Sequence, residues 1–300
     1  MEIIADTSEF YIERETAVAI GKFDGVHLGH IRLLDEVLQA KKRGLAACVF
    51  TFDPPPSVLF GGDAHVLTTN EEKHSIFERM GVDFLVEFPM TLETAAIPPS
   101  TFIVDYLVGQ LNTKFIVAGT DISFGRRGEG NAELLKAMAA EYDYDFKLID
   151  KVKNADGEEI SSSLVRECIA IGNMEKAESL LGSPYSVTGT VVKGNHIGHT
   201  LGFPTINIYP DENKLLPPFG VYAGKTEVKE KVYRSISNVG CKPTVGGEVR
   251  PSVETYLYDF DGELYGEEAM VELSAFRRPE TKFESLDALK AQLQKDIERY

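Results

Sequence analysis

The 300-residue sequence lacks several features that would place it in a specialised class of protein. Its three cysteines, Cys48, Cys168 and Cys241, stand apart with no C-x-x-C pair, which argues against a disulfide framework and suits a reducing compartment. No uninterrupted apolar run approaches the ~20 residues that a membrane span needs. The N-terminus shows no basic region followed by an apolar run, as a secretion signal would. The sequence therefore predicts a cytoplasmic protein without a membrane partner.

Basic residues are also scarce, with 31 Lys and Arg against 47 Asp and Glu, for a net charge of −16. This excess argues against a nucleic-acid partner, whose binding surface normally needs a basic patch, but leaves room for a small basic pocket that holds an anion. A hydrophobic content of 43% is typical of a globular chain, and 300 residues favour two domains.

The first half alternates short apolar segments with longer amphipathic ones. Near-continuous apolar strands separated by helices indicate an α/β doubly wound parallel sheet covered on both faces. Ligands bind such sheets at the carboxyl ends of the strands. The expected strands are 16–20, 45–52, 82–88, 114–118 and 144–149, and the expected helices are 28–43, 70–80, 99–111 and 130–142.

From about residue 185 the segments become short and rich in Val, Tyr, Thr and Ile, which is typical of an antiparallel barrel. A helix should close the chain after Ser285, a plausible N-cap. Two short helices over 163–182 join the halves, so we place the domains at 1–184 and 185–300. The expected barrel strands are 185–193, 203–208, 220–228, 231–237, 253–258 and 269–273.

The run GKFDGVHLGH at 21–30 follows the first strand and opens a helix. Its glycines allow a tight turn, and His27 and His30, three residues apart, share one face of the first helical turn. Because a helix N-terminus favours anions, the pair predicts a polyphosphate site. A βα turn with two surface histidines is the simpler alternative, and a zinc pair is a third, without a nearby cluster to complete its ligands.

The full string resembles the signature of the nucleotidyltransferase superfamily. With ISSSLVR at 160–166 and TLGFPTINI at 200–208 in the same order, the chain is similar to bacterial bifunctional riboflavin kinase/FMN adenylyltransferases, or FAD synthetases, from roughly residue 15 to 300. The resemblance implies an enzyme that phosphorylates riboflavin to FMN and adenylylates FMN to FAD with release of pyrophosphate. It also implies ATP as co-substrate, Mg²⁺ as metal, and a six-stranded antiparallel C-terminal β-barrel with a C-terminal helix.

For adenylyl transfer, the resemblance assigns His27 and His30 to the triphosphate and to the charge that develops at the α-phosphate. Asp121, in the GTDISFG loop at 119–125, would contact the flavin or the nucleotide. The family usually has a histidine at Pro55, within FDPPP. The remaining residues assigned to ATP in this half are Gly21, Phe23, Asp24, Gly25, Ser162, Ser163 and Arg166.

For the kinase, the resemblance assigns Thr205 and Asn207 to Mg²⁺ and the ATP phosphates. Both side chains point to one side of a strand, and Mg²⁺ prefers hard oxygen ligands. Glu254 would be the base that accepts the proton of the riboflavin hydroxyl, and Arg278 would lie near the flavin. A loop with Lys193, Gly194 and Gly198 would cover the nucleotide.

Two other functions stay open at this point. The chain could be a riboflavin kinase whose adenylyltransferase is weak or lost, since Pro55 cannot donate a hydrogen bond. It could also be a non-catalytic flavin or nucleotide sensor, although sensing alone needs no base. Taken singly, each motif also has an ordinary explanation, such as a helix start for ISSSLVR, a strand end for Thr-x-Asn, and a surface charge for Glu254 or Arg278.

Overall fold

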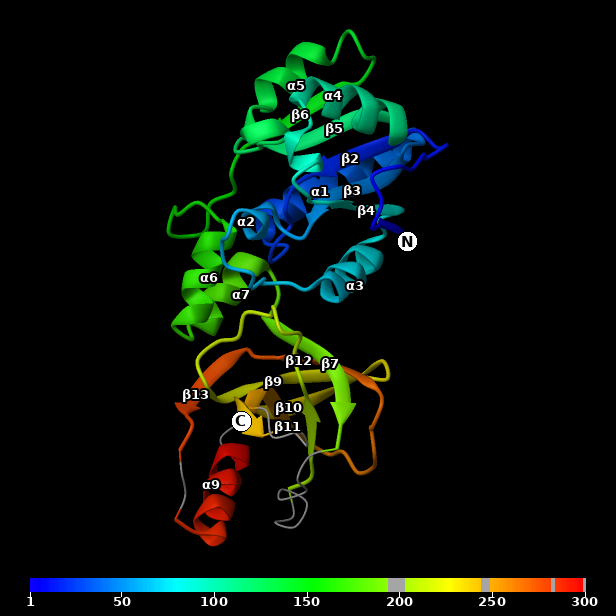
Figure 1. Cartoon of the computed structure of the whole chain (residues 1–300). Coiled ribbons are helices and arrows are strands. Elements are labelled where there is room, and N and C mark those ends of the chain that lie inside the picture. Colours follow the sequence, from blue (N-terminus) through cyan, green and yellow to red (C-terminus); the bar gives the residue numbers. More distant parts are fainter. Residues whose placement is uncertain (194–202, 244–248, 282–283, 299–300) are drawn as a thin grey trace. The chain divides into compact units, whose positions relative to one another are not determined.

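The computed structural model describes residues 1–193, 203–243, 249–281 and 284–298 (Figure 1). Contacts divide the chain into two compact units, Met1–Ser161 and Ser162–Tyr300. The helices α6 (Ser162–Ala170) and α7 (Met174–Leu181) thus group with the second unit, upstream of the domain boundary expected at 184. That functional boundary stays a prediction. Within the described ranges, no helix is both long and apolar enough to cross a membrane.

The first unit contains a six-stranded sheet in the order β1-β4-β3-β2-β5-β6, and every pairing is parallel. This confirms the doubly wound sheet that the sequence predicted. The edge strand β1 was not expected, because its four residues are too few to show a period. The strands are β1 (Glu2–Ala5), β2 (Thr16–Ile20), β3 (Ala46–Asp53), β4 (Phe84–Pro89), β5 (Thr113–Gly119) and β6 (Asp145–Ile149).

Helices cover both faces of this sheet (Figure 1). Ala19 and Val49 pack with Leu34 of α1 and Phe77 of α3 on one face, whereas Phe50 packs against Phe102 of η3 on the other. Successive strand residues point to opposite faces, which explains the near-continuous apolar strands. The helical segments are α1 (Leu28–Ala40), η1 (Lys41–Arg43), α2 (Pro56–Leu59), α3 (Asn70–Met80), η2 (Thr94–Ala96), α4 (Pro99–Thr101), η3 (Phe102–Gln110), η4 (Arg126–Gly128) and α5 (Ala132–Met138).

The helix expected over about 99–111 is present, but it is not a uniform α-helix. It begins with the short α4 and continues as the π-helix η3, in which the backbone N–H of Leu111 donates to the carbonyl of Tyr106, five residues back. An apolar pattern this dense does not distinguish an α-helical from a wider helical period.

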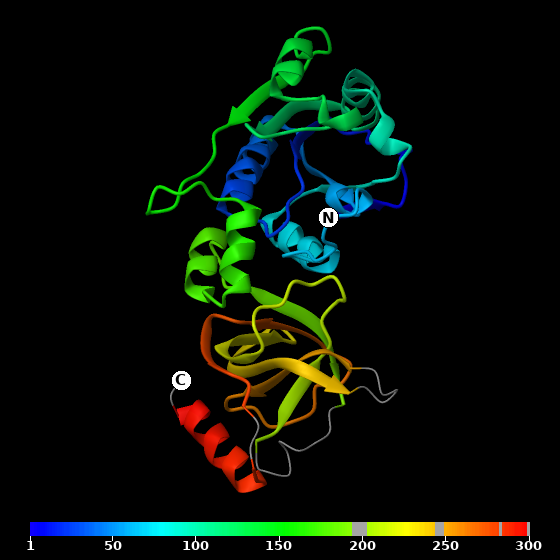
Figure 2. The same cartoon turned by 60° about the vertical axis from the view of Figure 1, so that its left-hand side comes forward.

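The second unit is a closed antiparallel barrel, as the sequence predicted (Figure 2). Six strands follow the order β10-β11-β8-β7-β12-β9, and β9 pairs back with β10. The strand β13, which was not expected, pairs with β9, and α9 (Leu286–Glu298) closes the chain with the Ser285 hydroxyl accepting from the Ala288 N–H at 3.2 Å. The strands are β7 (Ser186–Val192), β8 (Thr205–Ile208), β9 (Gly220–Val228), β10 (Lys231–Pro243), β11 (Val249–Leu257), β12 (Glu268–Glu272) and β13 (Ala275–Pro279).

Candidate active sites

The motif loops of the first unit leave the carboxyl ends of two neighbouring strands. β2 pairs with β5, and the strand order reverses between them, because β3 and β4 lie on one side and β6 lies on the other. Loops at such a switch point diverge and leave a crevice for a ligand. The GKFDGVHLGH turn follows β2 and the GTDISFG loop follows β5, so both loops line the crevice at the carboxyl ends of these strands, at one rim of the sheet.

The turn itself holds unusual backbone conformations. Gly25 has a φ of 87°, and Phe23 and Val26 have φ values of 49° and 41°. Positive φ at a β-branched residue is strained, and such strain concentrates at functional sites. The carboxylate of Asp24 fixes the turn by accepting from the Leu67 N–H at 2.7 Å.

Phe23 packs in the core beneath this turn. Its ring is fully buried, with ring centroids 5.1 Å from His30 and 5.7 Å from Phe77. A Cβ added at Gly21 would lie 3.2 Å from this ring, so Gly21 gives it room. The Phe23 side chain thus packs beneath His30, and a contact of this residue with ATP stays a prediction.

His27 and His30 lie together at the start of α1. His27 is its N-cap, and its Nδ1 accepts from the His30 N–H at 3.3 Å. The rings are stacked with centroids 3.8 Å apart. Nδ1 of His30 is buried without a hydrogen-bond partner in the described part of the chain.

Burial keeps both imidazoles neutral near pH 7. It lowers the pKa of His27 to about 4, although the carboxylates of Asp121 and Asp24 oppose this shift. Burial and the neighbouring His27 hold the pKa of His30 well below its usual range. The pair would therefore meet a phosphate as neutral N–H donors rather than as fixed cations.

Asp121 lies at the same rim, where its negative charge partly offsets the lowered pKa of His27. Its side chain is 74% exposed, and one carboxylate oxygen lies 3.9 Å from the Lys151 ammonium. An exposed carboxylate next to a lysine can accept a hydrogen bond from a flavin or nucleotide, but its ligand contact stays a prediction.

The structure also shows a cluster of ionisable residues that sequence reasoning missed. Lys73 of α3 and Glu87 of β4 are buried, and Nε2 of His74 lies 3.1 Å from a carboxylate oxygen of Glu87. Burial lowers the pKa of Lys73, while Glu87, Asp53 and Asp24 attract its charge. The available signal was helical spacing, because Lys73 lies one turn before the core residue Phe77 on the same face of α3.

Ser162, Ser163 and Arg166 belong to the first two turns of α6, as a helix start at ISSSLVR requires. They fall in the second unit, so their approach to the histidines of the first unit stays a prediction.

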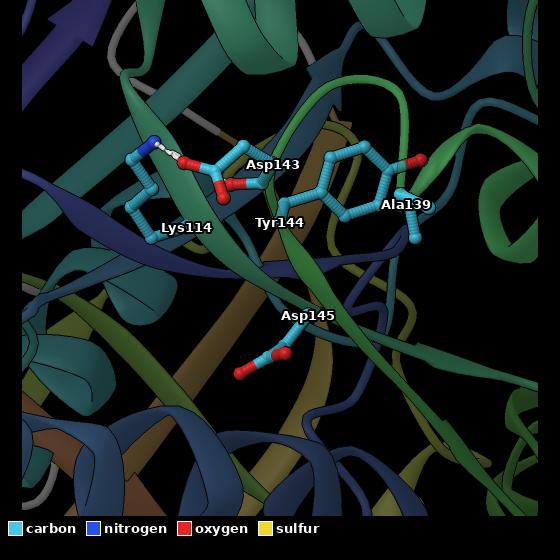
Figure 3. A pocket seen from close by; sticks show the side chains of 6 residues that line it. Lys114, Ala139, Asp143, Tyr144 and Asp145 are labelled. Carbon is cyan, nitrogen blue, oxygen red and sulfur yellow. Dashed lines mark hydrogen bonds and ion pairs between the residues drawn. The ribbon is translucent and has the colours of Figure 1, made fainter.

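A pocket near the opposite edge of the parallel sheet contains none of the predicted site residues (Figure 3). It lies where β5 and β6 begin, whereas the motif loops lie where strands end. The Lys114 ammonium there is bound to the Asp143 carboxylate at 2.7 Å, so its charge is already paired. The residues that line this pocket are Lys114, Ala139, Ala140, Asp143, Tyr144 and Asp145.

In the barrel, the predicted kinase residues come together on two paired strands. Asn207 of β8 is directly opposite Glu254 of β11. The Thr205 hydroxyl donates to Oε1 of Glu254 at 2.8 Å. Thr205, Asn207 and Glu254 therefore share one face of the paired strands, and Asn207 is itself buried there.

This arrangement fits a magnesium ion. The Thr205 hydroxyl donates a hydrogen bond to Glu254, so its oxygen lone pairs could bind a cation, and the Asn207 amide would supply a second hard oxygen. Within the described residues no three His, Cys, Asp or Glu side chains form a metal site. Few protein ligands suit Mg²⁺, which keeps waters and binds substrate phosphates as well.

Two further predicted residues have partners in the structure. Nη2 of Arg278 lies 2.7 Å from Asp296 of α9, and Nε of Arg278 lies 3.2 Å from the same carboxylate. This bidentate pair ties β13 to α9, and a flavin contact of Arg278 stays a prediction. The Lys193 ammonium lies 5.7 Å from the ring centroid of Tyr265, and Gly194 and Gly198 lie outside the described residues.

Two family models match the chain, FAD synthetase over residues 10–164 and riboflavin kinase over residues 181–300. The curated bifunctional riboflavin kinase/FMN adenylyltransferase of Listeria monocytogenes is 38% identical over 294 residues, covering 97% of this chain and 93% of the relative. Its namesake in Escherichia coli K12 is 38% identical over 283 residues, covering 93% and 90%. A crystal structure of a Streptococcus pneumoniae protein described as a macrolide-efflux protein is 31% identical, with a TM-score of 0.85, covering 99% of this chain and 97% of its own. The chain therefore belongs to the bifunctional riboflavin kinase/FMN adenylyltransferase family.

Proposed function

We propose that this protein phosphorylates riboflavin to FMN and then adenylylates FMN to FAD, using one ATP in each step. The observation that carries the kinase is the cluster on β8 and β11, where the Thr205 hydroxyl donates to Glu254 and Asn207 lies directly opposite Glu254. The rim with His27 and His30 supports the transferase. We expect the enzyme to work in the cytoplasm, where ATP is supplied and its three cysteines, none of them in a disulfide, stay reduced.

In the kinase step, the 5′-hydroxyl oxygen of riboflavin attacks the γ-phosphorus of ATP and ADP leaves. Glu254 accepts the hydroxyl proton as the new bond forms. Thr205 and Asn207 would hold Mg²⁺, which neutralises phosphate charge when bound. The hydrogen bond from Thr205 keeps the carboxylate of Glu254 in place beside that site.

In the transferase step, a phosphate oxygen of FMN attacks the α-phosphorus of ATP and pyrophosphate leaves. The enzyme needs no nucleophile of its own, so positioning and charge stabilisation supply the rate. The Nε2–H groups of His27 and His30 would donate to the phosphate oxygens. As neutral donors on a helix N-terminus, they can stabilise the growing negative charge.

A kinase with a weak or lost adenylyltransferase is the second candidate, and Pro55 favours it. Pro55 immediately precedes the short helix α2, where the family usually places a histidine. A prolyl side chain has no hydrogen-bond donor for ATP. Adenylyl transfer would then depend on the remaining groups of the rim.

One time course tests these candidates. Purified protein is incubated with riboflavin and MgATP, and FMN and FAD are separated by chromatography. FMN followed by FAD supports both activities, FMN alone supports the kinase with a lost transferase, and flavin binding without either product indicates a sensor.

A second experiment tests the role of Glu254. Glu254→Gln should lose roughly two to four decades of kinase rate, typical of a lost general base, while FAD formation from added FMN stays normal. A normal rate of FMN formation in this variant would remove Glu254 from the mechanism.

A further inference from the structure

A row of three polar side chains runs across one face of three neighbouring barrel strands. Asn207 of β8 is in register with Glu254 of β11, and Glu254 is in turn in register with Asn238 of β10. Directly opposed residues of antiparallel strands point to the same face, and neighbouring strands lie about 4.8 Å apart. The base candidate Glu254 therefore stands between two amides, one on each side.

Asn238 is held by a residue that lies far away in the sequence. Its Nδ2 donates to Oε1 of Glu280 at 2.9 Å, and Glu280 directly follows β13. Because a carboxylate at neutral pH only accepts hydrogen bonds, this contact fixes which end of the amide faces Glu280. The carbonyl oxygen of Asn238 is left to face another partner.

Gly240 makes this contact sterically feasible. It lies two residues after Asn238, so both positions belong to the same face of β10. A Cβ built at Gly240 would overlap the carboxylate of Glu280. The backbone of β10 thus leaves a space that the Glu280 side chain fills beside Asn238.

Glu254 has Asn207 on one side and Asn238 on the other, and we assign a different substrate to each side. This assignment rests on the proposed kinase activity. Thr205 and Asn207 lie on the side of the phosphate donor. In a direct transfer the acceptor hydroxyl contacts both the base and the phosphorus of the donor. With the donor on the side of Asn207, the rest of the acceptor molecule then extends along the side of Asn238. The acceptor is a hydroxyl at the end of a chain that carries several more hydroxyls.

We propose that Asn238 and Glu280 bind the hydroxylated side chain of riboflavin and thereby deliver its terminal hydroxyl to Glu254. An amide oxygen and a carboxylate accept hydrogen bonds from hydroxyls, and the amide N–H group can donate one. Glu280 both orients Asn238 and offers its own carboxylate. The pair selects flavins by the polyol chain rather than by the ring system.

Kinetics of Glu280→Ala and Asn238→Ala test this assignment. Glu280 is exposed, so its truncation leaves the packed core unchanged. We expect the KM for riboflavin to rise about 10-fold, as for the loss of one or two hydrogen bonds, with the KM for ATP unchanged. Glu268→Ala, which removes a similar exposed charge from β12, is the matched control and should behave as the wild type.

A binding measurement separates chain recognition from a general structural effect. Fluorescence titration with riboflavin should show weaker binding in both variants. Titration with lumiflavin, which carries a methyl group in place of the polyol, should show no change. Equal losses for both ligands, or a KM for riboflavin that stays within twofold of the wild type, would overturn the assignment.

Gly240→Ala offers an independent check, because it should expel the Glu280 carboxylate and reproduce the Glu280→Ala phenotype. FAD formation from added FMN depends on the first unit, so a wild-type rate shows that this unit is folded in each variant. Thermal unfolding shows whether the barrel is folded. If the wild type forms no FMN, the proposed kinase fails. If the wild type forms FMN and the variants bind riboflavin normally, only this inference fails.

Discussion

The imidazole rings of His27 and His30 are stacked face to face, with centroids 3.8 Å apart and planes inclined by 14°. The N-cap hydrogen bond from the His30 N–H to His27 Nδ1 locks this geometry onto the first turn of α1. Because the two rings are stacked in one buried site, a positive charge on either ring makes protonation of the other less favourable. The pair is therefore prearranged and neutral before any anion arrives.

This neutrality predicts that acid weakens the first unit. The pKa of His27 is about 4 when folded against 6.5 as the ordinary value, so between these pH values the unfolded chain binds more protons. The free energy of unfolding should then fall as the pH drops from 6.5 towards 4, by up to about 3 kcal/mol for His27. Urea unfolding at several pH values measures this loss.

His27→Asn is the matching variant, since Asn keeps the N-cap and does not titrate. Its unfolding free energy should depend less on pH than that of the wild type over the same range. An unchanged pH dependence in His27→Asn would contradict the assigned origin.

His30→Ala should slow FAD formation from FMN by about two to three decades, the scale of losing one transition-state donor. Riboflavin phosphorylation should continue at the wild-type rate, because that site lies in the other unit. Steady-state rates of the two reactions in one preparation make the comparison. Wild-type turnover of FMN in this variant would refute a role for the pair.

Gly29→Ala should impair adenylyl transfer without touching a ligand. A Cβ at Gly29 would lie 3.0 Å from Cε1 and Nδ1 of His27, so the ring must shift. A misplaced donor can cost about 10- to 100-fold in rate, while alanine raises helix propensity by up to about 1 kcal/mol. FAD formation should therefore fall although alanine favours the helix. The control variant Asp35→Ala, on the exposed side of α1, should form FAD at the wild-type rate.

Lys73→Met should lower the free energy of unfolding, because the buried carboxylate of Glu87 loses a cation that it attracts. Burial, which lowers the pKa of Lys73, opposes this loss, so it should stay below the roughly 3 kcal/mol typical of breaking a buried ion pair. The double variant Lys73→Met with Glu87→Gln should recover much of this loss, since the buried charge left behind is gone as well. Urea unfolding of the two single variants and the double variant completes the cycle. Strictly additive effects would show that the two residues do not interact.

Local sequence determined much of this protein. Apolar alternation and turn residues predicted both the parallel sheet and the barrel, because these patterns follow from side-chain direction within each element. The spacing of His27 and His30 predicted one helical face, and that of Thr205 and Asn207 one strand face. These relationships span only a few residues, so the backbone period alone decides them.

Only the tertiary structure decided the contacts between distant segments. Asn207, Glu254 and Asn238 form a row because three strands pair in one register, and a shift of one residue would turn a strand's side chains to the other face. Arg278 of β13 pairs with Asp296 of α9, and no sequence pattern in either segment predicts this contact. Such contacts depend on the closure of the barrel, which the pattern of a single strand does not encode.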